Sequence, residues 1–472
     1  MNWKTIFKSF KNSDMRNRVL AVLGIIIVYR FMAHIPVPLA EPTELKDIMN
    51  SAIESNSFGG FLNLLSGGAL ASFSIMLVGL APYITSSIIS QLLTKAVPKL
   101  EEMHKDGESG RRKINQWTRV IALPLAVLQS VAYIFILRQT VLSGASTITD
   151  MSMNQWVVAV SAMTAGAIML MWLGEIITEK GIGNGISLLI FAGIISQLPN
   201  TLGALGSSLF SVETADQAFH MFNWFTIPWL NHTAVILISI VGVIALLVLY
   251  LLVKINEGQR IITINYAKRI HGNSAYGGIK SILPIKLITA GVIPVIFAVA
   301  FLALPAFVGQ LLVATGNNVE LGQNLIIWFQ RSSANTLGMA NEWTQWIYPV
   351  SYFVLVVAFT YFYTSIVFNS REIAENLQKQ GGFIDGVRPG KQTEKYLSRI
   401  VTRLTLFGSL ALGLIAVLPF IFEYVFVSLG LGDAASMLAI GGTGLLIVVS
   451  VALESIRQLS SRALMVTYDE YK

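Results

Sequence analysis

The residue types that usually perform chemistry are scarce in this chain and poorly spaced for it. The five histidines (His34, His104, His220, His232 and His271) fall at the ends of apolar segments or between them, and no HExxH spacing occurs to ligate zinc. No aspartate lies in the middle of an apolar segment, no GxxxxGKS or GxxxxGKT phosphate loop is present, and there is no cysteine. The sequence therefore predicts neither an enzyme nor a protein with a metal or another cofactor.

Five ionisable residues do lie within or beside apolar segments, all near the expected ends: Arg30, Glu175, Lys286, Glu423 and Glu454. Because side chains there can reach the lipid headgroups, we expect each of them to do so. An ion-coupled transporter would be expected to carry a carboxylate at the centre of the membrane, and this sequence has no good candidate for one. Unwound backbone can, however, also bind ions. An ion-coupled inverted-repeat permease for a small solute therefore stays open as an alternative.

The elements that carry these residues are expected to be membrane-spanning helices. Of the 472 residues, 54% are hydrophobic and 12% charged, whereas a soluble domain has about 25% charged residues. Apolar runs of the roughly 20 residues that cross a bilayer predict spans near 19–39, 73–93, 117–138, 153–177, 184–205, 233–253, 283–312, 346–368, 400–421 and 435–453. We expect one membrane domain, 1–472, with five-helix halves at 19–205 and 233–455, a count that permits an inverted repeat.

The basic residues predict the orientation of these helices. If the spans alternate in direction, only Arg30, Lys46, Arg138 and Arg331 of the 33 lysines and arginines fall on or towards one side. Because basic residues near span ends resist translocation, the other side is expected to be cytoplasmic and to hold both termini. The run from Val19 is expected to be retained as a helix and not removed as a signal peptide. Two basic loops on that side, 254–282 and 369–399, suit an acidic partner, ribosomal RNA or a soluble motor.

One apolar segment is too short to span the membrane. Residues 58–71 read FGGFLNLLSGGALA and are separated from the next span by Gly67 and Gly68. They predict either a half-inserted, re-entrant helix, which implies an internal cavity or pore, or an interfacial helix on the outer surface. Two prolines within predicted spans, Pro82 and Pro294, are expected to kink or interrupt their helices.

Eight strings in the chain together resemble the SecY family, the central channel subunit of the general protein-secretion translocon. They are SGGAL at 66–70, APYITSSIISQLL at 81–93, GESGRRKINQWTR at 107–119, MWLGEIITEKGIGNGISLLIFAGI at 171–194, INYAKR at 264–269, AGVIPVIFA at 290–298, VRPGKQTEKYL at 387–397 and GGTGLLIVV at 441–449. The resemblance covers nearly the whole chain. It implies an all-α integral membrane protein whose two pseudo-symmetric five-helix halves surround a central pore with a re-entrant plug.

The resemblance also implies roles for particular residues. The pore constriction would be a ring of aliphatic side chains at Leu80, Ile84, Ile186, Ile190, Ile296 and Ile447, which can seal by dewetting and deform around a peptide. The plug would include Phe61, Leu62, Leu64, Leu65, Ser66, Gly67 and Gly68. The lateral gate, between the second and third spans and the seventh and eighth, would carry the polar residues Thr85, Ser87, Gln129 and Thr289. The tips of the basic loops would contact partners through Arg260, Lys268, Arg269 and Arg388.

The function implied is a passive protein-conducting channel in the bacterial cytoplasmic membrane. It would pass unfolded secretory chains with signal sequences and release membrane helices laterally into the lipid bilayer. Its expected partners are small SecE-like and SecG-like subunits, the SecA motor ATPase and the ribosome with its RNA. Three positions depart from the family pattern and bear on gating and partner contacts: Ile288 beside Thr289 where an Asn is frequent, Ile261 where a second Arg is common, and Asp385 where Pro is usual.

Overall fold

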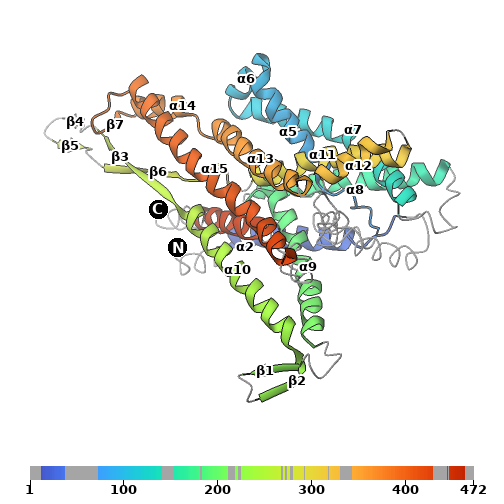
Figure 1. Cartoon of the computed structure of the whole chain (residues 1–472). Helices are drawn as coiled ribbons and strands as arrows, with labels where there is room; N and C mark the ends of the chain where they lie inside the picture. The colour runs from blue at the N-terminus through green and yellow to red at the C-terminus, as the bar shows by residue number, and fades with distance from the viewer. Residues whose placement is uncertain are drawn as a thin grey trace.

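The structure is a computed structural model of the chain (Figure 1). It describes residues 12–37, 73–140, 153–180, 183–210, 218–221, 225–266, 269–271, 274–276, 280–291, 293–316, 318–329, 343–428, 444 and 446–462. The predicted plug residues (Phe61, Leu62, Leu64, Leu65, Ser66, Gly67 and Gly68) and Lys268 lie outside the described residues.

Helices make up most of the described chain. They are α2 (Ser13–Met32), α5 (Ala81–Ala96), α6 (Pro98–Lys105), α7 (Glu108–Thr140), α8 (Met153–Lys180), α9 (Gly185–Phe210), α10 (His232–Glu257), α11 (Ile293–Thr315), α12 (Val319–Phe329), α13 (Thr344–Val367), α14 (Ser370–Lys379) and α15 (Lys391–Ser428), followed by helical residues 446–462, here the C-terminal helix. Within the described part, six helices are long and apolar enough to cross a membrane, and they lie in α7, α8, α10, α11, α13 and α15. The other predicted spans fall on α2, α5, α9 and the C-terminal helix.

Helix α11 occupies a central place in the packing. It contacts α5 and α7 on one side and α13 on another, while α13 in turn packs against α15. A buried apolar cluster runs through these helices and through α2, α8, α9 and the C-terminal helix, and includes Ile84, Ile190, Ile296, Tyr352 and Ile447. Since lipid tails are as apolar as these side chains, it is close packing that holds the helices together. The two chain segments expected to border a lateral gate are therefore in contact.

The seventh predicted span begins later than expected, and both proline predictions are wrong. Residues 280–286, expected inside or beside that span, form strand β6, and α11 starts only at Ile293. Pro82 and Pro294 consequently lie in the first turn of α5 and α11. A proline there has no helical hydrogen bond to lose and its fixed φ suits a helix start. These prolines begin their helices and do not kink them.

The two basic loops form one structural unit. Strand β3 (Gln259–Tyr266) pairs with β6 (Lys280–Lys286) and also with β7 (Gly382–Ile384), which comes from the second loop, in the order β6-β3-β7. We call these three strands the loop sheet. Its inner face, with Ile262, Ile285 and Ile384, packs on Leu397 and Val401 of α15. Burial of this apolar face is what ties the loops to the helical bundle.

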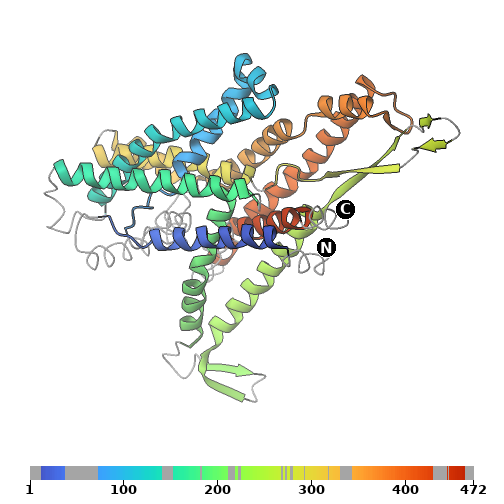
Figure 2. The same ribbon diagram turned by 180° about the vertical axis from the view of Figure 1, so that it is seen from behind.

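Two small hairpins complete the strands. One, β1 (Ala218–Met221) with β2 (Phe225–Asn231), precedes α10, and the other, β4 (Arg269–His271) with β5 (Ser274–Tyr276), continues the β3–β6 ribbon. Figures 1 and 2 show the loop sheet projecting from the helices, with β4 and β5 at its far end. They also place β1 and β2 at the opposite end of α10. The loop sheet is thus separated from the β1–β2 hairpin by the length of a membrane-crossing helix.

Candidate functional site: two cavities that meet at an apolar constriction

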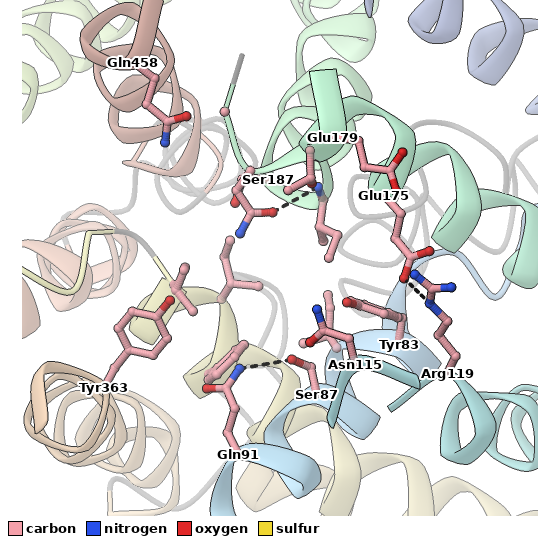
Figure 3. Close-up of a pocket in the computed structure, with 18 of the residues that line it drawn as sticks. Tyr83, Ser87, Gln91, Asn115, Arg119, Glu175, Glu179, Ser187, Tyr363 and Gln458 are labelled. Carbon is pink, nitrogen blue, oxygen red and sulfur yellow. Dashed lines mark hydrogen bonds and ion pairs between the residues drawn. The ribbon is translucent and has the colours of Figure 1, made fainter. Parts of the chain in front are cut away.

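A wide cavity of about 960 Å³ lies among α2, α5, α7, α8, α9, α11, α13 and the C-terminal helix. Polar side chains line much of it, as Figure 3 shows: Tyr83, Ser87, Gln91 and Asn115 face Gln458 and Tyr363 across the space. Its ionisable lining residues carry both signs of charge: Asp14, Arg18, Arg119, Glu175, Glu179 and Arg462. The lining of this cavity therefore mixes polar groups with both signs of charge and is not a cluster of one charge.

Two lining contacts stiffen this cavity wall. Arg119 Nε on α7 donates to Glu175 Oε1 on α8 at 2.6 Å, and Gln91 Nε2 donates to Ser87 Oγ within α5 at 3.1 Å. The Glu175 side chain is only 17% exposed, so its charge is held by this ion pair. The expectation that Glu175 reaches the headgroups is therefore wrong. It is also wrong for Glu423, which is 3% exposed between packed helices.

A second, narrow cavity of about 80 Å³ continues from the wide one. Of the six predicted ring residues, Leu80, Ile84, Ile190, Ile296 and Ile447 line it, while Ile186 lines the wide cavity. Two of them, Ile84 on α5 and Ile296 on α11, line both cavities. The structure thus brings residues from four distant parts of the sequence to one apolar constriction. Such a constriction can exclude water and ions without a bound ligand.

The four predicted gate residues do not form one cluster. Thr85 on α5 and Gln129 on α7 both line the narrow cavity, where Gln129 Oε1 has no hydrogen-bond partner among the described residues. Ser87 lines the wide cavity instead. Thr289 Oγ1 donates to Thr364 Oγ1 of α13 at 3.5 Å, so it faces a helix that is expected on the same side of the gate. Two aromatic rings are in contact where α7 meets α11, at the expected gate: the ring centroids of Tyr133 on α7 and Phe307 on α11 lie 5.5 Å apart.

The predicted partner residues that the structure describes lie on the loop sheet or close to it in the chain. Arg269 begins β4 at the far end, whereas Arg260 pairs with Ile285 near the base of the ribbon and not at its tip. Arg388 is exposed just after β7. Asn265 Nδ2 donates to Asp385 Oδ1 at 2.6 Å. Asp385, one of the three positions that depart from the family pattern, therefore links the second basic loop to the first.

Sequence reasoning missed one wall of the narrow cavity. Small and apolar residues of α11 line it: Val299, Ala300, Ala303, Leu304 and Phe307. They follow Ile296 at the spacing of one helix face, and this periodicity was the signal that could have found them. Small side chains on that face leave room beside the constriction.

Comparison with known proteins agrees with this architecture. A SecY family model matches residues 74–456. A protein translocase subunit SecY of Corynebacterium glutamicum is 39% identical over 98% of each chain, and one of Mycobacterium bovis is 38% identical over 98% of each. A solved protein-conducting channel superposes with a TM-score of 0.61 at 19% identity, covering 93% of this chain and 90% of that one. Sec61 in a canine ribosome–channel complex gives 0.54 at 18%, covering 93% and 90%.

A bundle of membrane-spanning helices around two cavities that meet at an apolar constriction defines an integral membrane channel. Within that class, the chain belongs to the SecY family. The predicted all-α membrane fold is thereby confirmed, since the superposed structures are channels of this fold. The division into halves at 19–205 and 233–455 stays a prediction.

Proposed function

We propose that the chain is the channel-forming subunit of a protein translocase, through which unfolded secretory polypeptides cross the bacterial cytoplasmic membrane. The observation that carries this is the junction of the two cavities at Ile84 and Ile296. Bulky apolar side chains without a polar ligand set form a seal that deforms around a passing chain of any sequence. Both relatives named above are described as protein translocase subunits.

Transmembrane segments would leave through the seam where α11 contacts α5 and α7. Interhelical hydrogen bonds in membranes are each worth only about 0.6 kcal/mol on average, so a seam with few of them opens at low cost. Thr85, Gln129 and the Tyr133–Phe307 contact are the groups that an entering apolar segment would displace. We propose that residues 61–68 form the plug that closes the pore on the far side.

The partners proposed are SecE-like and SecG-like subunits, the SecA motor and the ribosome. One superposed Sec61 channel was solved in a ribosome–channel complex. The loop sheet and the residues just after β7 are the proposed docking surface, because the sheet projects from the bundle, Arg260 on β3 is exposed, and so is Arg388 just after β7. Its side of the membrane, with both termini, would be the cytoplasm, as the distribution of basic residues predicts.

An ion-coupled permease finds no support in the site. The Glu175 carboxylate is paired with Arg119, and among the described residues no ionisable side chain other than Tyr133 lines the narrow cavity. A coupled transporter would need a solute site at that depth.

Reversing the charge of Arg388 tests the docking proposal. We expect Arg388→Glu to raise the dissociation constant for the motor about tenfold and to slow translocation, because a cationic rim residue attracts an acidic partner. The fold should persist, since the hydrogen bond at this residue uses its main-chain carbonyl, which accepts from Thr393 Oγ1. Binding is measured on vesicles at two salt concentrations.

The matched control is Arg403→Glu, an exposed arginine on α15 that is not part of the three strands of the loop sheet. It should leave motor binding unchanged. Equal affinity of the Arg388 variant and the unchanged chain for both motor and ribosome would contradict the proposed docking surface.

A further inference from the structure

The C-terminal helix links the pore to the base of the loop sheet. At one end its Ile447 lines the narrow cavity, and further along its Gln458 and Arg462 line the wide one. The same helix forms part of the buried cluster through Ile447 and Val451. Any displacement of this helix therefore changes the wall of both cavities.

Arg457 joins this helix to the start of the loop sheet. Its Nη2 donates to the main-chain oxygen of Asn256 at 2.8 Å, and its Nη1 donates to Asn256 Oδ1 at 3.2 Å. Asn256 is the penultimate residue of α10, and β3 begins at Gln259. The last carbonyls of a helix lack partners within it and carry partial negative charge, so a guanidinium with two aligned donors binds well there.

The end of β6, at this same base of the β3–β6 ribbon, is also near the C-terminal helix. Glu454 lies beside Gly291, where an added Cβ would stand 3.4 Å from Glu454 Oε2, just after β6 and before α11. Lys286, the last residue of β6, is near both Glu454 and Arg457. Its pKa is lowered from the ordinary value, first by burial and then by the Arg457 charge, while the Glu454 charge acts in the opposite direction. Leu287 N donates to the Gly258 oxygen at 2.8 Å and closes the base of the ribbon. Both strand ends therefore meet one face of the C-terminal helix.

We infer that Arg457 is a positioning residue that transmits movement of the loop sheet to the pore wall. When a partner moves the sheet, the Arg457–Asn256 contact carries the displacement to the C-terminal helix and through it to Ile447. This inference rests on the proposed function, because it needs a partner on the sheet and a polypeptide in the pore. Arg457 itself is not expected to contact the partner or the polypeptide.

The test uses the complete chain with its small partner subunits in vesicles and compares Arg457→Gln with the unchanged protein. Losing hydrogen bonds from a charged group should slow motor-driven translocation of a secretory protein about tenfold. Motor affinity should stay within about twofold, because Arg457 lies outside the docking surface. Arg457→Lys should give an intermediate rate, since a single ammonium can still donate to the Asn256 carbonyl.

Two further variants separate coupling from a structural role. Asn256→Ala removes only the Oδ1 contact and should slow translocation less than Arg457→Gln, and the two changes combined should cost less than the sum of their separate effects. Arg403→Gln removes an exposed arginine from α15 and should change nothing. A normal translocation rate in Arg457→Gln would overturn the inference, as would a parallel loss of motor affinity and translocation. If the unchanged complex failed to translocate at all, the proposed function itself would fall, and the coupling with it.

Discussion

Replacing Ile84 and Ile296 together by serine is expected to make the resting channel conduct ions. These two side chains stand where the wide and narrow cavities meet. Exposing the apolar part of an isoleucine side chain to water costs about 1.5 kcal/mol or more. Replacing it by serine lowers the free-energy cost of hydrating the constriction by about that amount for each residue, so water enters more readily. For two residues this corresponds to a rise in conductance of roughly 100-fold.

The conductance is measured in planar bilayers with residues 61–68 deleted from both the variant and its reference, so that the proposed plug does not mask the constriction. Ile195→Ser is the control, because Ile195 is 37% exposed on α9 and lines neither cavity. Equal conductance of the double variant and its reference would show that the seal lies elsewhere.

Gly185→Ala should prevent the chain from accumulating as a folded protein. A Cβ at Gly185, the first residue of α9, would overlap the main-chain oxygen of Gly174 on α8 and lie 2.9 Å from Ile177 Cβ. The turn is fixed as well, because Gly185 N donates to Thr178 Oγ1, which itself donates to the Gly174 oxygen, each at 2.9 Å. A clash with backbone cannot be relieved by a side-chain rotation, so the cost should exceed about 3 kcal/mol.

A loss of that size is a large part of the stability of a typical domain, about 5–15 kcal/mol. Gly203→Ala provides a matched control on α9, because an added Cβ there meets nothing within 4 Å. The amounts of protease-resistant protein in membranes and the midpoints of thermal unfolding are compared. Should Gly185→Ala unfold at the same temperature as Gly203→Ala, the close approach of α8 and α9 would be wrong.

The membrane spans could be predicted from sequence because a bilayer imposes length and apolarity locally. The same reasoning failed at residues 283–291, since the apolar Leu283 and Ile285 face α15 from a strand whose partner strand lies some 20 residues earlier. Hydropathy does not distinguish such a strand from a helix start. Pro82 and Pro294 were misinterpreted for a related reason. The effect of a proline depends on how far it lies from the first residue of the helix, and sequence does not fix that residue exactly.

The polar contacts that organise the site could not be predicted from the sequence. Arg119 meets Glu175 across 56 residues, and Arg457 meets Asn256 across 201. No local pattern pairs them, because each pairing depends on how separate helices pack. The apolar ring residues were placed by family resemblance, and five of the six do line one narrow cavity. Their role as a ring around a passing chain stays a prediction.

The most direct test of the channel places single cysteines in this cysteine-free chain at Ile84, Ile190 and Ile447. Each variant is assembled with a stalled secretory chain that carries one cysteine within the membrane, and disulfide formation is measured. Val243, 64% exposed on α10, and Phe407, 67% exposed on α15, provide outward-facing controls. We expect crosslinks at all three cavity positions and none at the controls. No crosslinks at the three, with the stalled chain shown to be targeted to the membrane, would contradict the proposed path.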